Sequence, residues 1–90
     1  MTSKVLTEIL THHGKCKREG DRFLLPADVG ASIYAAVGIE ALTIDQVNEV
    51  ALDPEVMVAV TTRGDRYVVA YEDVRAFRFH GRGRTTGYGT

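Results

Sequence analysis

Two apolar runs on either side of a polar hexapeptide place the strongest constraint on how this chain folds. VMVAV and YVVAY consist of β-branched, aromatic and small residues and one methionine, and TTRGDR separates them. Residues of the first two kinds favour strands, and a Gly-Asp pair readily adopts the positive backbone angles of a two-residue hairpin turn. The pattern therefore predicts strands over residues 56–61 and 66–71, joined by a turn at Gly64-Asp65.

The length of this turn decides which side chains share a face of the predicted hairpin. A two-residue loop places Val60 opposite Val69 and Val58 opposite Tyr71, because the residues that flank the loop pair with each other. Side chains two apart in a strand point to the same face. The face expected to form the heart of the core comprises Val56, Val58, Val60, Tyr67, Val69 and Tyr71.

Periodicity predicts one more strand and a helix at the two ends of the chain. In VRAFRFH, Phe77 and Phe79 alternate with polar or small residues, which indicates a strand over residues 75–80 with one solvent-exposed face. Near the N-terminus, apolar residues recur at helical spacing after Thr2, a residue type that caps helices. A helix is expected over residues 3–13.

The segment GDRFLL echoes GDRYVV, 44 residues later, and an Asp-Val pair follows each copy. The earlier copy is expected to turn at its own Gly-Asp pair and to form a polar edge hairpin, with Glu19 opposite Arg22. Two explanations of the echo stay open. One is duplication of a helix-hairpin unit, and the other is turn chemistry alone.

The middle of the chain is compatible with helix and with strand. Pro26 suits the first turn of a helix, and apolar residues at helical spacing follow it until Gly38, so a second helix is expected there. In IEALTIDQVNEVALDP, Thr43 and Gln46 fit a capping box and favour a third helix. The same pattern over residues 44–52 also fits a strand, and this alternative stays open.

These elements predict a small single domain of the α+β class. Its antiparallel sheet is centred on strands 56–61, 66–71 and 75–80, with an N-terminal edge hairpin and two or three short helices. A chain of 90 residues has room for one core. We expect residues 1–80 to form the domain and residues 81–90 to form a Gly/Arg-rich C-terminal tail.

Composition indicates a soluble protein without a membrane segment. Hydrophobic residues make up 44% of the chain and charged residues 26%, values that are ordinary for a globular domain. No apolar run approaches the roughly 20 residues of a membrane-spanning helix, and the N-terminus lacks the features of a signal peptide. Cys16 is the single cysteine, so no internal disulfide forms. Together these features predict a cytoplasmic location.

No residue pattern indicates catalysis or a bound cofactor. His12, His13 and Cys16 lie close together in sequence, but the end of a helix cannot aim all three at one tetrahedral metal centre. Acidic pairs such as Glu72-Asp73 flank predicted turns, where carboxylates serve capping and solubility. We therefore expect a protein that is not an enzyme and that holds no metal or cofactor.

Charge is arranged in blocks along the chain. Residues 1–22 carry five basic and three acidic groups, residues 23–62 carry six acidic and no basic groups, and residues 63–90 carry six arginines and three acids. Such blocks can pair between subunits or with a charged ligand. The predicted turn also sets two arginines opposite each other, a pair that needs a neutralising group. The expected partner-binding residues are Arg63, Arg66, Glu72, Asp73 and Arg78.

Residues 47–77 resemble the second half of a PRC-barrel, a small β-barrel of ribosome-maturation and photosynthetic reaction-centre proteins. The likeness lies in LDP at 52–54 before a strand, in the apolar hairpin, and in YEDV at 71–74 before a closing strand. This resemblance implies a mainly-β PRC or SH3-like barrel as the alternative fold. It also implies a non-enzymatic adaptor that docks onto another protein.

The expected function is that of a non-catalytic protein-binding or oligomerising module, acting as a small cytoplasmic adaptor or regulatory protein. The expected partners are a second copy of the chain, because the core is small, and another protein that is not identified. The alternative is binding of DNA or RNA, since arginines alternate with aromatic residues near the C-terminus. The residues of this alternative are Arg63, Arg66, Arg78, Arg82 and Arg84.

Overall fold

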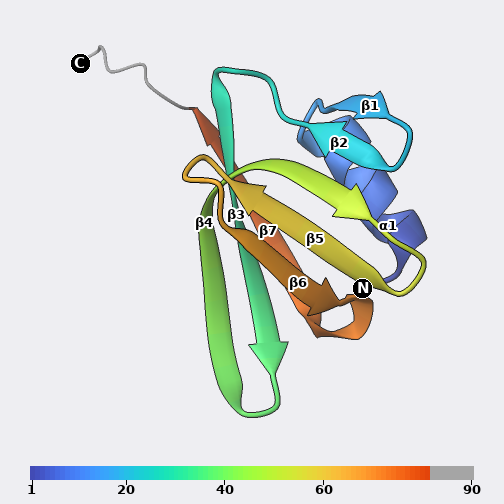
Figure 1. Cartoon of the computed structure of the whole chain (residues 1–90), viewed down its shortest axis with the longest axis vertical. Coiled ribbons are helices and arrows are strands. Elements are labelled where there is room, and N and C mark those ends of the chain that lie inside the picture. Colours follow the sequence, from blue (N-terminus) through green and yellow to red (C-terminus); the bar gives the residue numbers. More distant parts are fainter. Residues whose placement is uncertain (82–90) are drawn as a thin grey trace.

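One long strand, β4 (Glu40–Leu52), organises the fold (Figure 1). The computed structural model describes residues 1–81. Within them, antiparallel strands form a small curled sheet, a half-barrel, beside one short helix. The other elements are α1 (Ser3–Glu8), η1 (Ile9–His13), β1 (Lys17–Glu19), β2 (Arg22–Leu24), β3 (Val29–Val37), β5 (Val56–Thr61), β6 (Arg66–Ala70), η2 (Tyr71–Asp73) and β7 (Val74–Gly81).

β4 pairs with different strands along its two edges. On one edge, β3 pairs with the first half of β4 and β2 with residues 49–51, while β5 pairs with residues 47–52 on the other edge. An extra β4 residue opposes β3 near Gln46, whose φ is 60°, and a second irregularity lies at Asn48 beside β5. Bulges bend a strand and increase its twist, which lets β4 belong to both walls of the curled sheet.

Among the described strands, β1, β6 and β7 each have one neighbour in the sheet. β7 pairs with the outer edge of β3 and β6 with the outer edge of β5, giving the order β6-β5-β4-β3-β7. The β1–β2 hairpin lies beside the second half of β4 (Figure 1). Among residues 1–81 no ladder joins β6 to β7, so the half-barrel is open between them and η2 turns the chain from one to the other.

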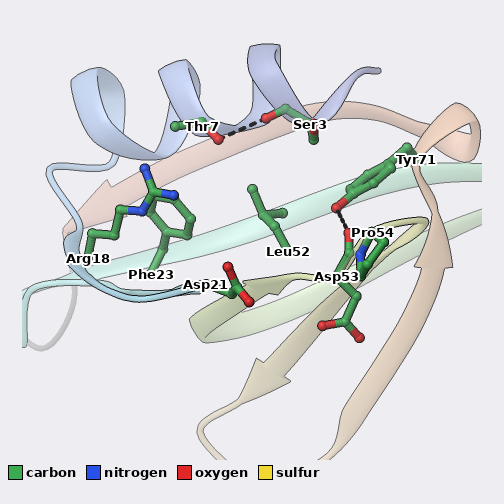
Figure 2. Close-up of a pocket in the computed structure, with 9 residues that line it drawn as sticks. All are labelled: Ser3, Thr7, Arg18, Asp21, Phe23, Leu52, Asp53, Pro54 and Tyr71. Atoms are coloured by element: carbon green, nitrogen blue, oxygen red, sulfur yellow. Dashed lines mark hydrogen bonds between the residues drawn. The ribbon is translucent and has the colours of Figure 1, made fainter.

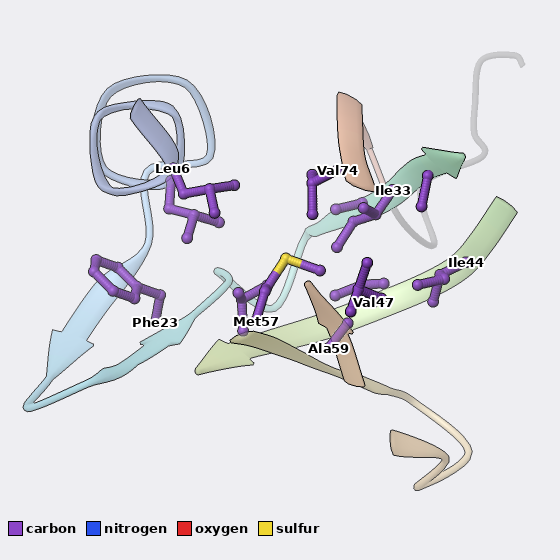
Figure 3. Close-up of a cluster of buried hydrophobic side chains, with 13 residues drawn as sticks. Leu6, Phe23, Ile33, Ile44, Val47, Met57, Ala59 and Val74 are labelled. Carbon is purple, nitrogen blue, oxygen red and sulfur yellow. The ribbon is translucent and has the colours of Figure 1, made fainter. Parts of the chain in front are cut away.

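The core fills the concave side of the sheet beneath α1 (Figure 3). Leu6 and Leu10 lie one helical turn apart and have no exposed surface. They belong to the core cluster, through which the helix packs against Phe23 and the sheet. Apolar burial of this kind is the main favourable term in folding. The cluster contains Leu6, Leu10, Phe23, Ala31, Ile33, Ala35, Ile44, Val47, Val50, Met57, Ala59, Val69 and Val74.

The N-terminal helix is confirmed, with a change of hydrogen-bond pattern in its second half. The Thr2 hydroxyl accepts a hydrogen bond from the Val5 N–H at 3.2 Å and caps α1. From Ile9 to His13 the helix widens into a π-helical turn, and the Gly14 N–H donates to the Ile9 carbonyl at 3.0 Å. The wider turn ends where the chain reverses toward β1.

The two helices predicted for the middle of the chain are wrong, because these residues form β3 and β4. The strand alternative that was left open for residues 44–52 is confirmed. The two irregularities in β4 explain the error there. They add residues to the strand, so that its buried side chains fall at Ile44, Val47 and Val50, three residues apart rather than two. A spacing of three imitates one face of a helix. In β3 both faces are buried over residues 30–33, so no alternation marks the strand.

The predicted register of the β5–β6 hairpin is also wrong. The loop has three residues, 62–64, because the Thr61 N–H donates to the Asp65 carbonyl at 2.9 Å and the Gly64 N–H to the Thr61 carbonyl. Gly64 has a φ of 90°, which closes a type I turn with a bulge. Val58 therefore pairs with Val68, and the core face carries Met57 and Ala59 in place of the three valines that the sequence predicted.

Other predicted strands are confirmed. β1 and β2 pair Glu19 with Arg22 across a two-residue turn, and β1 is an exposed edge. In β7, Phe77 and Phe79 lie on the core side and stack with ring centroids 5.8 Å apart. Residues 1–81 thus form mainly strands with one short helix, rather than a sheet with two or three helices. Most of the predicted tail lies outside the described residues.

Candidate functional site

Four of the residues that the sequence singled out, Arg63, Arg66, Glu72 and Asp73, lie at the two ends of one strand, β6. Arg63 is in the β5–β6 turn and Arg66 begins β6, and both are exposed. Glu72 and Asp73 lie in η2, directly after β6 ends. The turn end of the strand therefore has a net positive charge, since Asp65 lies between the two arginines, and the η2 end has a net negative charge. We call this segment, residues 63–73, the β6 edge segment.

Two expectations about the arginines change with the structure. Arg66 pairs with Val60 across the hairpin and not with Arg63, so the unfavourable arginine pair predicted at the turn does not form. Arg78 lies on β7, at the opposite end of the sheet order, where it pairs with Ser32. Arg82 and Arg84 lie outside the described residues. The nucleic-acid alternative stays a prediction.

The outward edge of β6 is free of any strand among residues 1–81. The hydrogen bond from the Thr61 N–H to the Asp65 carbonyl sets the alternation of the hairpin ladder. In this alternation, the N–H and C=O groups of Tyr67 and Val69 point toward β5. The N–H and C=O groups of Arg66, Val68 and Ala70 point toward the free edge. An edge of this kind is a template for another strand.

An apolar surface adjoins this edge on the side of the sheet away from the core. Ala51, Val58 and Val68 form a cross-strand row over β4, β5 and β6, and Val68 is 66% exposed. Val58 is buried but does not belong to the core cluster. Figure 1 shows no other element in front of β5 and β6 on this side. We call it the outer apolar face, made up of Ala51, Val56, Val58, Val60, Val68 and Ala70.

An ion pair borders the outer apolar face. The Arg22 guanidinium donates to both carboxylate oxygens of Glu49, at 2.9 and 3.1 Å. The hydrogen bond from Arg22 lowers the pKa of Glu49, and the charge of Arg66 acts in the same direction. Since Glu49, Val60 and Arg66 form one cross-strand row, the carboxylate lies between two arginines. The border is thus charged and fixed in place.

A cavity of about 290 Å³ opens between α1, the β1–β2 hairpin and the turn after β4 (Figure 2). At one end the Arg18 guanidinium lies 5.1 Å from the centre of the Phe23 ring. At the other end, the Tyr71 hydroxyl donates to the Asp53 carbonyl. Burial, and then the charges of Asp53 and Asp21, raise the pKa of Tyr71. This lining offers contacts of both charge signs to a small polar molecule.

A second cavity, of about 360 Å³, lies between the helix and β7. Its lining is largely apolar and includes Met1, Ile9 and the stacked Phe77 and Phe79. His13 and Arg75 add two basic groups. This hollow lies where Met1 and η1 meet β7, and its described lining gives no arrangement of nucleophile and base.

Among the residues described, no three His, Cys, Asp or Glu side chains lie close enough to hold a metal. His12 instead faces Glu8 one helical turn earlier, at 3.9 Å. Cys16 is partly buried and is not in a disulfide. Burial raises the pKa of the Cys16 thiol from 9.0 to about 11, which makes it a poor nucleophile at neutral pH.

The high pKa of Cys16 predicts slow alkylation of the folded protein. A difference of two pH units means about a hundredfold less thiolate than in the unfolded chain below pH 9. Iodoacetamide labelling, followed by mass spectrometry in buffer and in urea, measures the two rates. Because the neutral thiol is favoured in the fold, the associated stability is present below pH 9 and is lost as the pH rises toward 11. Equal rates in buffer and urea at pH 8 contradict the prediction.

No helix within residues 1–81 is long and apolar enough to cross a membrane. Comparison of the chain with models of known protein families, with curated proteins and with solved structures finds no match.

Sequence reasoning found the charged ends of the β6 edge segment but missed the outer apolar face. Val58 and Val60 were assigned to the core because the loop was taken as two residues long. The sequence feature that could have indicated a three-residue loop is Thr61. Its side chain accepts a hydrogen bond from the Asp65 N–H at 3.2 Å. A threonine at this place favours the longer loop, because it satisfies a peptide group that the turn leaves free.

Proposed function

We propose that this chain is a non-catalytic protein-binding module, which accepts an extended strand at the free edge of β6. The observation that carries the proposal is the open edge itself, which offers the peptide groups of Arg66, Val68 and Ala70 beside an exposed apolar side chain. In strand addition, main-chain hydrogen bonds supply affinity, and alternate side chains supply specificity. Such a module acts as a small adaptor or regulatory protein in the cytoplasm.

The composition of the edge supports this proposal. Soluble proteins protect free edges with proline, lysine, bulges or a covering loop. β6 contains no proline and no lysine, and its ladder with β5 runs without a bulge. Val68 projects from the middle of the strand onto the outer apolar face. An edge with an apolar centre, whose charged residue Arg66 lies at its first position, suits a strand that binds another strand.

The order of elements supports a PRC or SH3-like barrel as the finer description of the fold. β3 to β7 form a meander in which the first and last strands pair, and a 3₁₀ helix precedes the last strand. The residues that carried the likeness occupy the turn before β5 and the η2 corner before β7. Barrels of this kind dock onto other proteins, in keeping with a role as an adaptor.

The proposal is tested by selecting peptides from a displayed library of random sequences on the folded protein. Selected peptides are expected to protect the amides of Arg66, Val68 and Ala70 from hydrogen exchange. Replacing Val68 by proline removes an edge N–H without removing a bond to β5, and is expected to reduce affinity at least about tenfold.

Threonine at position 68 is the matched control, because it keeps the N–H and the strand propensity and replaces one methyl group by a hydroxyl. Peptides that bind the proline and wild-type proteins equally contradict the proposal. So do peptides whose protection maps to either cavity and not to the β6 edge segment.

A further inference from the structure

Resting on this proposed function, we infer that the strand accepted by β6 is β6 of a second copy of the chain. The two strands run antiparallel about a two-fold axis that passes beside Val68. The resulting dimer joins two half-barrels into one continuous sheet. Three independent features of the β6 edge segment meet in this arrangement: the direction of its peptide groups, its charge and its apolar centre.

The peptide groups define the register. In an antiparallel ladder, a residue whose N–H and C=O both point to the neighbour exchanges two hydrogen bonds with its partner. Val68 is such a residue on the free edge, so it can pair with the partner's Val68 on the axis. Arg66 then pairs with the partner's Ala70, and Ala70 with the partner's Arg66. All three outward-facing residues of each strand find partners.

The charges of the β6 edge segment are complementary to themselves in this register. Arg63 lies in the turn before β6, and Glu72 and Asp73 lie in η2 after it, so the two groups lie beyond opposite ends of the strand. An antiparallel pair brings the basic end of one copy to the acidic end of the other. Arg66 then pairs with the partner's Ala70, which lies two residues before the partner's Glu72. The symmetry repeats both contacts, as it does in an isologous interface.

Other pairings of the same strand lose one of these features. A parallel arrangement sets Arg66 beside the partner's Arg66, and an axis at Arg66 does the same. An axis at Tyr67 or Val69 presents residues whose peptide groups already face β5. An axis at Ala70 pairs Val68 with the partner's Glu72, which lies in η2 and not in a strand. Of the axes on β6, the one at Val68 combines outward peptide groups with opposite net charges at its two ends.

The apolar surface becomes continuous across the same axis. The row formed by Ala51, Val58 and Val68 meets its symmetry copy, so the outer apolar face extends over both subunits. Val68, which is 66% exposed in the single chain, lies beside the partner's Val68. Cross-strand pairs of β-branched residues stabilise sheets, and here the pair lies at the centre of the interface.

Charge reversal tests the dimer, because recovery of a dimer on mixing two variants cannot result from unfolding of either variant. Arg63→Glu with Arg66→Glu makes both ends of β6 acidic, and Glu72→Arg with Asp73→Arg makes both ends basic. Each variant alone is expected to dissociate, with a dissociation constant at least about a hundredfold above that of the wild type. An equimolar mixture of the two variants is expected to recover a dimer, because each basic end then meets an acidic end.

The masses are measured by sedimentation equilibrium at micromolar concentration, with circular dichroism to confirm that each variant is folded. A fourfold variant carrying all these substitutions is the matched control, since it reverses the direction of the charges and keeps their complementarity. It is expected to be dimeric.

A monomeric wild-type protein overturns the inference, and so does a mixture that fails to associate or a dimer unaffected by either pair of substitutions. None of these outcomes decides whether β6 accepts other strands, because that proposal is tested separately by the peptide selection.

Discussion

Replacing Ile33 by alanine is expected to lower the free energy of unfolding by about 2 to 5 kcal/mol. Ile33 has no exposed surface and lies at the middle of β3, between Ile44 of β4 and Phe77 of β7. The substitution removes buried methyl groups and leaves a cavity that two flanking strands cannot close. Urea denaturation followed by circular dichroism measures the change.

Ile39→Ala is the matched control for this prediction, because it makes the same chemical change on a side chain that is fully exposed at 101% in the turn between β3 and β4. Its effect is expected to stay within about 0.5 kcal/mol. Equal losses at the two positions mean that the effect at Ile33 does not come from its burial in the core. A loss below about 1 kcal/mol at Ile33 means that the cavity closes, contrary to the packing described above.

The strands near the C-terminus could be predicted because their signals are local. VMVAV, YVVAY and the alternation of Phe77 and Phe79 fall in β5, β6 and β7. The polar edge hairpin with Glu19 opposite Arg22 is confirmed for the same reason, since a Gly-Asp pair needs no distant contact to turn. Local turn chemistry and periodicity were therefore sufficient to predict the strands other than β3 and β4.

The centre of the sheet could not be predicted because it depends on contacts between distant segments. β4 has two different partners on one edge and β5 on the other, and its bulges accommodate all three. Those bulges put Ile44, Val47 and Val50 in the core at a spacing of three. From the sequence alone this spacing predicts a helix. The strand forms because pairing with distant segments overrides local propensity.

The candidate site was predicted in part. Arg63, Arg66, Glu72 and Asp73 were singled out by charge and by the like-charged pair expected at the turn. The structure gives these residues a different arrangement, because a third loop residue moves Arg66 away from Arg63. The sequence predicted a cluster of arginines at the tip of the hairpin. Because the loop is one residue longer than predicted, the structure instead has a strand whose two ends carry opposite net charges.

The echo between the two Gly-Asp segments corresponds to a common path of the chain. Each copy forms a hairpin, and the Asp-Val pair that follows each copy opens a strand, with Val29 beginning β3 and Val74 beginning β7. β3 and β7 then pair with each other. The turns differ, since Glu19 pairs with Arg22 around two residues while Thr61 bonds to Asp65 around three. Similar local sequence therefore sets similar elements but not their register.

Replacing Gly14 by alanine is expected to destabilise the protein by about 1 to 3 kcal/mol. Gly14 has a φ of −83°, so alanine brings no backbone strain, and a Gly→Ala change in an allowed conformation otherwise stabilises by about 0.4 to 1 kcal/mol. The expected loss is steric. A methyl group here meets Cε1 of Phe79 at 2.8 Å, the Leu10 carbonyl oxygen at 3.0 Å and Sγ of Cys16 at 3.1 Å.

The stacking of Phe79 on Phe77 and the backbone position of the Leu10 carbonyl limit how far these groups can move. Gly81→Ala is the matched control, because a methyl group there meets nothing within 4 Å. The double variant Gly14→Ala with Phe79→Leu separates the contact from other effects. Leucine leaves more room at the ring edge, so the two substitutions are expected to cost less together than the sum of their separate costs. Additive costs in thermal unfolding mean that the Phe79 ring does not restrict position 14, and that the helix meets β7 less closely than the structure describes.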